Sequence, residues 1–181
     1  MLRNTNERWG LVQQTLHWLI VALVVAQLLV GMTLGDTPAD DPLWQSLFPV
    51  HATIGLSILI VMLVRLGWRA LNPVPVLPDS LKPWQKTLAH ANHWLLYILL
   101  IGLPIGGYLM VSAYGQPVPF FGAELPPIIP KNQGLADTIK TLHSLGAAII
   151  VVLVALHIAG ALRHGYMLKD GVLRRMAPFL K

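Results

Sequence analysis

The seven histidines are the residues of this sequence best suited to chemistry, because the chain has no cysteine and is otherwise strongly apolar. They are His17, His51, His90, His93, His143, His157 and His164. A neutral imidazole binds metals and exchanges a proton near neutral pH. The absence of cysteine excludes disulfides, iron–sulfur clusters, thiolate zinc sites and covalently attached c-type haem. The chemistry to expect is therefore metal or haem binding, or proton exchange, through imidazole.

The spacing of the last three histidines indicates two stacked centres. His143 and His157 lie fourteen residues apart in one apolar run, which is just under four helical turns. Both therefore lie on nearly one helix face, about 21 Å apart along the axis. That separation is too large for one metal centre and suits two. His164, seven residues further on, stays on the same face.

Four apolar runs must position these histidines, and each is long enough to cross a bilayer, which takes roughly 20 residues. The chain has 181 residues, of which 55% are hydrophobic and 12% charged, and its mean hydropathy is +0.61. A soluble domain of this size cannot bury so much apolar surface. We therefore predict an all-α integral membrane protein, a four-helix transmembrane bundle. Its spans are expected at about 11–34, 47–70, 88–113 and 139–164.

The whole chain, 1–181, is expected to form a single transmembrane domain. The stretch 115–136, rich in proline and glycine, is predicted to be its longest loop. The first apolar run is longer than the apolar part of a signal peptide and is not followed by a small-residue cleavage site. We therefore expect this run to be retained as the first span.

The basic residues are distributed unevenly about the predicted spans, and this sets the orientation in the membrane. Only Lys131 and Lys140 fall on one side, together with most of the acidic residues. The other side holds eleven basic residues, which are Arg3, Arg8, Arg65, Arg69, Lys82, Lys86, Arg163, Lys169, Arg174, Arg175 and Lys181. Both termini are therefore predicted to be cytoplasmic. The net charge of +5 is interpreted as topology and lipid contact, and no nucleic-acid binding is expected.

Depth in the membrane pairs four of the histidines. His17 lies in the first turns of the first span and His157 in the last turns of the fourth, so both lie toward the cytoplasm, whereas His51 and His143 lie toward the outer face. Two facing imidazoles at each level are what two bis-histidine b-type haems require in a four-helix bundle. Zinc or copper is the competing interpretation. Structural zinc takes four clustered ligands, however, and neither pair has a further histidine or carboxylate nearby in sequence.

His90 and His93 leave several roles open at the start of the third span. Either could replace His17 as a ligand, contact a haem propionate, or lie in a substrate pocket. Both could equally be polar residues at the membrane interface. A haem-free channel or transporter would need a continuous polar path, which the four spans do not offer.

Several motifs together resemble the bacterial cytochrome b-561 family of small, four-helix, di-haem membrane cytochromes. They are Leu16-His17-Trp18-Leu19, Val50-His51-Ala52-Thr53-Ile54-Gly55, Leu88-Ala89-His90-Ala91-Asn92-His93, Gly102-Leu103-Pro104-Ile105-Gly106, and Leu142-His143 with Leu156-His157. The resemblance covers essentially the whole chain, in order. It implies haem ligation by His17, His51, His143 and His157, and a place in the bacterial inner membrane.

The chain looks most like the superoxide oxidase branch of that family. Members of this branch take an electron from superoxide at the outer face and pass it through both haems to ubiquinone. The resemblance implies a quinone pocket at the cytoplasmic end that uses His164 and a lysine of the second loop, here Lys82. His90 is a further candidate for this pocket.

Two departures keep a second function open. Asp79-Ser80-Leu81 stands where a more basic stretch is expected in the second loop. The outer face also offers few cations, chiefly Lys131 and Lys140, to attract superoxide. The alternative function is an electron-relay membrane subunit that links quinone or quinol to a separate redox partner protein.

Overall fold

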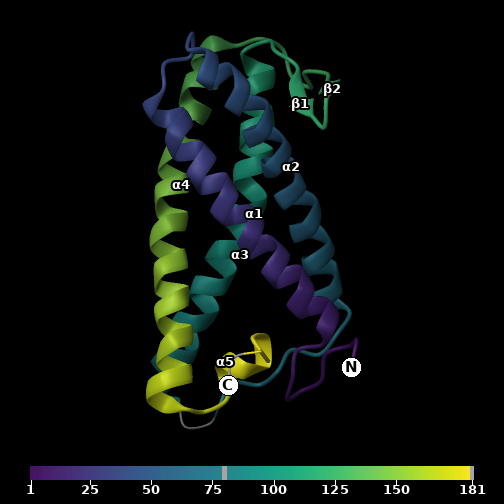
Figure 1. The fold of residues 1–181 in the computed structure, drawn as a ribbon, viewed down its shortest axis with the longest axis vertical. Coiled ribbons are helices and arrows are strands. Elements are labelled where there is room, and N and C mark those ends of the chain that lie inside the picture. Colours follow the sequence, from purple (N-terminus) through teal and green to yellow (C-terminus); the bar gives the residue numbers. More distant parts are fainter. Residues whose placement is uncertain (79–80, 180–181) are drawn as a thin grey trace.

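The computed structural model describes residues 1–78 and 81–179 of the chain. Lys181 and the pair Asp79-Ser80, which entered the arguments above, lie outside the described residues. Four long helices form an elongated bundle (Figure 1), and they are α1 (Leu11–Asp36), α2 (Pro42–Ala70), α3 (Pro83–Ala113) and α4 (Gln133–Leu162). A short hairpin, β1 (Val118–Phe120) and β2 (Ala123–Leu125), precedes α4. A π-helical turn, η1 (Arg163–Leu168), and the short helix α5 (Val172–Met176) follow it.

The bundle has two distinct ends (Figure 1). Both termini and α5 lie at one of them, which we name the terminal end, and the β1–β2 hairpin lies at the other, the hairpin end. All four long helices are long and apolar enough to cross a membrane, the fourth span running on through η1 to Leu168. The prediction of an all-α, four-span membrane bundle is thus confirmed.

Three of the long helices begin before the apolar runs that predict them, because polar caps and prolines start them. Pro42 opens α2, and the Asp41 carboxylate accepts a hydrogen bond from the Leu43 amide at 2.7 Å. Pro83 opens α3 in the same way. At the start of α4, the Asn132 side chain accepts from the Leu135 amide at 3.0 Å.

The helices pack in chain order, α1 on α2, α2 on α3 and α3 on α4. A small core of Ile20, Val24, Ile58, Met62 and Tyr97 joins the first three helices. Large apolar side chains elsewhere point outward, and many of them are more than half exposed in the bare chain. This inverted pattern is the one expected of a bundle whose solvent is lipid.

The hairpin end differs from the predicted loop over 115–136. The structure has the β1–β2 hairpin and the first residues of α4 within that stretch. Phe121 and Gly122 form the turn with φ of 48° and 82°, as a two-residue hairpin turn of the primed type requires. Strands of three residues are too short to show an alternating pattern, which is why the sequence did not reveal them.

The two terminal segments are tied together at the other end. The Gln14 amide donates to the Trp9 carbonyl and to the Arg175 carbonyl, each at 3.0 Å. The Trp18 indole donates to the Met176 carbonyl at 3.0 Å, so α5 is fixed against the start of α1. The Arg175 guanidinium also donates to the Val76 carbonyl at 2.6 Å, which adds the α2–α3 link to this assembly.

Candidate functional site

Near the hairpin end, His51 of α2 faces His143 of α4. Their ring centroids are 6.2 Å apart, with planes inclined by 65°. Two imidazoles on opposite sides of one metal, each with a metal–nitrogen bond of about 2.0 Å, have centroids roughly 6 Å apart. α2 and α4 are not among the helix pairs that pack closely within the described chain. This hairpin-end pair therefore has the separation that a shared metal ion requires.

The edges of these two rings rest against glycines. A Cβ on Gly31 of α1 would lie 3.1 Å from His51 Cε1, and one on Gly107 of α3 would lie 3.4 Å from His143 Cε1. Nδ1 of both histidines is covered and has no hydrogen-bond partner among the described residues. Nε2 is thus the ring nitrogen left to a metal. The Gln27 amide nitrogen lies 3.2 Å from His51 Nε2 and donates to it when that nitrogen is unprotonated.

Three histidines meet near the terminal end. The ring centroids of His17 and His157 are 6.1 Å apart, and those of His93 and His157 are 5.2 Å apart. The structure thus brings together both pairs predicted from depth, and it adds His93 to the second. His17 and His157 are partly buried, whereas His93 is exposed in the bare chain. We name His17, His93 and His157 the terminal-end cluster. In this cluster His93 can be a ligand or the neighbour of a ligand.

The hairpin-end pair and the terminal-end cluster lie at two levels along the bundle. On every long helix, a spacing of fourteen residues connects these two levels. It separates His17 from Gly31 on α1, His51 from Arg65 on α2, His93 from Gly107 on α3, and His143 from His157 on α4. Fourteen residues are about 21 Å along a helix and return to nearly the same face. Each helix thus presents one residue of this set at each level.

The donor set fits haem better than zinc or copper. No three His, Cys, Asp or Glu side chains of the described chain gather closely enough to hold a metal ion. A bare metal would therefore find only two protein ligands at the hairpin-end pair, whereas structural zinc takes four. A b-type haem supplies four nitrogens itself and needs just one imidazole on each side. Two imidazoles about 6 Å apart between helices that are not closely packed meet that need.

The residues predicted for the quinone pocket are more scattered. His164 lies in η1, where its Nδ1 is 2.6 Å from Asp170 Oδ2. Lys82 caps α3, its backbone amide donating to Gln85 Oε1 at 3.0 Å, and its side chain is exposed. His90 is also exposed on α3. Among the described residues, no hydrogen bond, ion pair or ring contact joins Lys82 or His90 to His164.

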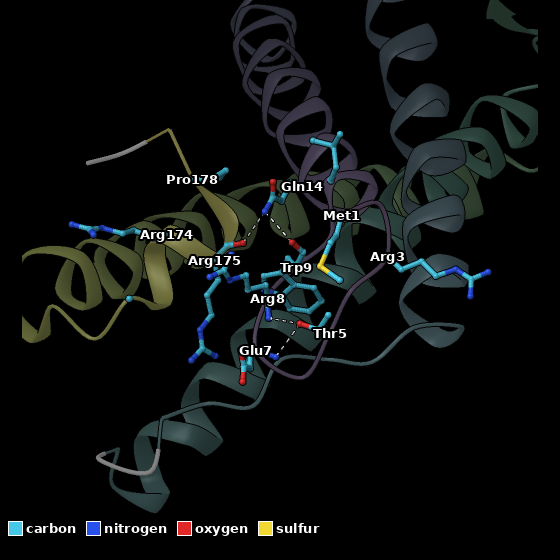
Figure 2. A pocket seen from close by; sticks show the side chains of 12 residues that line it. Met1, Arg3, Thr5, Glu7, Arg8, Trp9, Gln14, Arg174, Arg175 and Pro178 are labelled. Carbon is cyan, nitrogen blue, oxygen red and sulfur yellow. Dashed lines mark hydrogen bonds between the residues drawn. The ribbon is translucent and has the colours of Figure 1, made fainter.

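A cavity of about 730 Å³ opens at the terminal end, between the N-terminal segment and α5 (Figure 2). Its walls include Arg3, Arg8, Trp9, Gln14, Arg174 and Arg175. None of the histidines lines it. The cavity is therefore separate from the terminal-end cluster and from the residues predicted to bind quinone.

Charge divides the two ends. The described part of the terminal end holds ten of the eleven basic residues predicted there, and the hairpin end holds only Lys131 and Lys140. Five carboxylates lie at the hairpin end, which are Asp36, Asp40, Asp41, Glu124 and Asp137. Tyr114 donates to Asp137 Oδ1 at 2.9 Å, and burial together with this carboxylate raises the pKa of the tyrosine hydroxyl.

A membrane bundle of four helices with facing imidazoles at two depths is the architecture of a b-type membrane cytochrome. The family model for prokaryotic cytochrome b561 matches residues 8–179. The chain belongs to this family. It is accordingly a multi-pass protein of the bacterial inner membrane that binds b-type haem and transfers electrons.

Individual relatives align over nearly the full length of the chain. A Yersinia pestis protein named probable superoxide oxidase CybB is 32% identical over 173 residues, covering 96% of this chain and 97% of the relative. Cytochrome b561 homolog 2 of Escherichia coli (strain K12) is 32% identical over 174 residues, covering 96% and 93%. Cytochrome b561 homolog 1 of the same strain is 30% identical over 172 residues, covering 94% and 97%.

Proposed function

We propose that the chain holds two b-type haems. His51 and His143 would ligate the one nearer the hairpin end, and His17 and His157 the one nearer the terminal end. The centroid separations of 6.2 Å and 6.1 Å support this choice, since both match two imidazoles on one metal. When bound, each haem supplies a one-electron redox couple.

The proposed orientation puts the terminal end in the cytoplasm and the hairpin end outside. It is supported by the ten described basic residues at the terminal end, against two at the hairpin end. A reporter enzyme fused after Lys181 tests it. A fusion that is active only in the cytoplasm is expected, and one that is active only when exported would reverse the assignment of the two ends.

The function that the geometry supports best is electron transfer across the membrane from superoxide, outside, to ubiquinone at the terminal end. In balance, two superoxide ions lose one electron each to give two O₂, and quinone takes up two electrons and two protons to give quinol. The single observation that carries this proposal is a pair of histidine sites about 21 Å apart along α4. Such a pair lets an electron cross most of the bilayer while the protein stays still. The relative named a probable superoxide oxidase supports the choice of electron donor.

His164 is proposed to serve the quinone. Asp170 Oδ2, 2.6 Å from Nδ1, fixes the orientation of the ring and leaves Nε2 free to face a ligand. From Nε2 the imidazole would donate a hydrogen bond and then a proton to a quinone oxygen. Lys82 and His90 are proposed as further donors in the same pocket, both exposed at the start of α3.

The test mixes the oxidised holoprotein with a superoxide source and a soluble ubiquinone analogue, and follows haem reduction and quinol formation separately. Fast haem reduction is expected in the parent protein and in His164→Ala, with quinol formation lost only in the variant. Asp170→Asn is the matched control for ring orientation and should slow quinol formation less than His164→Ala. Haems that superoxide does not reduce would overturn the proposed reaction.

The second candidate is an electron relay between quinol and a separate redox protein. The observation that favours it is the acidic hairpin end, where five carboxylates accompany two lysines. Such a surface repels the superoxide anion and would attract a basic partner. Haems that quinol reduces and superoxide does not would identify the relay.

A further inference from the structure

Arg65 of α2 is a partly buried cation at the level of the terminal-end cluster. It lies fourteen residues after His51 and one turn before Arg69. Its Nε is covered and has no hydrogen-bond partner among the described residues. The guanidinium carbon lies 5.6 Å from the centre of the Tyr97 ring. An arginine keeps its charge even when it is buried, so this position contributes a permanent positive charge inside the bundle.

The positive charge of Arg65 interacts with all three histidines of the terminal-end cluster. Arg65 acts electrostatically on His17, His93 and His157. Arg69 adds a second cation, 5.9 Å from the Tyr97 ring centre and 5.7 Å from that of Trp9. No carboxylate of the described residues forms an ion pair with either arginine. Within residues 1–78 and 81–179, no ion pair therefore cancels the positive charge near the cluster.

The hairpin-end pair lies in the opposite environment. All arginines lie toward the terminal end of the bundle, and the residues that α1 and α3 present beside His51 and His143 are Gly31 and Gly107. The charged groups at their end of the bundle are five carboxylates and two lysines. The terminal-end cluster is therefore the more positive of the two levels, both in the residues inside the bundle and in the charged residues at the bundle end.

Two further side chains near this level of the bundle carry unpartnered polar atoms. The Trp68 indole nitrogen, one turn further along α2, is covered and has no partner among the described residues. The Gln13 side chain, one turn before His17 on α1, is completely buried, and both of its amide atoms lack a described partner. Buried polar groups are rarely left without partners. Such donors suit the two propionate carboxylates of a haem, and no described carboxylate pairs with them.

We propose that Arg65 is a positioning residue that raises the reduction potential of the terminal-end haem site above that of the hairpin-end site. The proposal rests on the two-haem function proposed above. Reduction adds one negative charge, which a buried cation stabilises strongly where water is excluded. If a propionate pairs with Arg65, removal of the arginine leaves that carboxylate uncompensated, and the sign of the effect is the same. The electron would then rest preferentially at the terminal end, beside the proposed quinone pocket.

The experiment is a potentiometric titration of the purified holoprotein, followed by haem absorbance. Each variant is also made in the His143→Ala background, so that the terminal-end haem is titrated alone. Arg65→Gln is expected to lower the potential of that haem by at least 59 mV, which is a tenfold change in its one-electron equilibrium. Arg65→Lys, which keeps a cation at this position, should lower the potential by less than half as much as Arg65→Gln. Lys140→Gln, which removes an exposed cation at the hairpin end, should leave the terminal-end potential unchanged.

The outcomes separate this proposal from the function on which it rests. A haem-to-protein ratio below two in the parent chain would contradict the two-haem function. A parent ratio of two with an unshifted terminal-end potential in Arg65→Gln would overturn the role of Arg65, as would equal shifts at both sites. If Arg65→Gln does not retain the haem, Arg65→Lys decides. A haem-loaded lysine variant near the parent potential supports the proposal, and a fall of 59 mV or more in that variant overturns it.

Discussion

The two ends of the bundle place histidines on the same four helices, but in different surroundings. At the hairpin end, α2 and α4 offer His51 and His143, while α1 and α3 offer only Gly31 and Gly107. At the terminal end, fourteen residues away on each helix, α1, α3 and α4 all offer imidazoles and α2 offers Arg65. Because α1 and α3 present glycines at the hairpin end, only one pair of ligands is possible there. At the terminal end three imidazoles are present, so side-chain geometry decides which two of them are ligands.

The hairpin-end pair should be broken by removing either of its histidines, which is the largest effect that we expect. His51→Ala and His143→Ala each leave one imidazole at that level, so haem content should fall from two per chain to one. A pyridine haemochrome assay against protein concentration measures this ratio. His164→Ala removes an imidazole outside both levels and should keep two haems. Retention of two haems in both alanine variants would show that the ligands lie elsewhere.

The terminal-end cluster should respond unequally to its histidines. His17→Ala should lose the terminal-end haem, because the 6.1 Å separation from His157 matches a shared metal. His93→Ala should retain that haem, because the 5.2 Å separation is too short for the same geometry. Absorption spectra of the reduced variants, compared with His143→Ala, show which haem remains. The reverse result would make His93 the ligand and His17 its neighbour.

Replacing a hairpin-end glycine by valine is expected to destabilise haem binding more when the added Cβ lies closer to a histidine ring. Gly31→Val places its Cβ 3.1 Å from His51, and Gly107→Val places its Cβ 3.4 Å from His143. Overpacking of this kind costs about 1–3 kcal/mol. We expect Gly31→Val to lower the temperature of haem loss most, and Gly107→Val less. Gly67→Val, where no atom lies within 4 Å of the added Cβ, is the matched control. Equal effects at all three positions would indicate a general helix penalty only.

Gln27 should give the smallest effect, confined to the hairpin end. Its amide nitrogen lies 3.2 Å from His51 Nε2, the nitrogen that would bind the metal. Removing one hydrogen bond of about 1 kcal/mol should strengthen haem binding there by roughly fivefold. Haem titration of the apoprotein from Gln27→Leu, with the terminal-end haem as internal reference, measures this change. Weaker haem binding in the variant would mean that the amide supports the site instead.

The fold was predictable wherever chain length and hydropathy decide it. Four apolar runs predicted four spans, and the structure has four helices long enough to cross a membrane. The early starts of α2, α3 and α4 were missed because their caps, Asp41, Lys82 and Asn132, precede the apolar residues. The hairpin was missed because its strands are three residues long.

The candidate site was predictable along each helix and less so between helices. Spacing shows which residues share a face, and depth matching brought His17 to His157 and His51 to His143 as the structure does. The rotation of one helix against another depends on packing, which the sequence does not show. His93 could therefore not be ranked against His17. The position of Arg65 near a span end indicates only topology, although its fourteen-residue distance from His51 is visible in the sequence.

The fourteen-residue interval has a consequence for insertions and deletions in the gene. Adding or removing a single residue between the two levels turns every later side chain of that helix by about 100°. One such change in α4 would move either His143 or His157 from its partner, even though hydropathy and span length would hardly change. The connections at the two ends of the bundle are free of this restriction. Natural length variation should therefore collect in the loops, while the segments 17–31, 51–65, 93–107 and 143–157 keep a fixed number of codons.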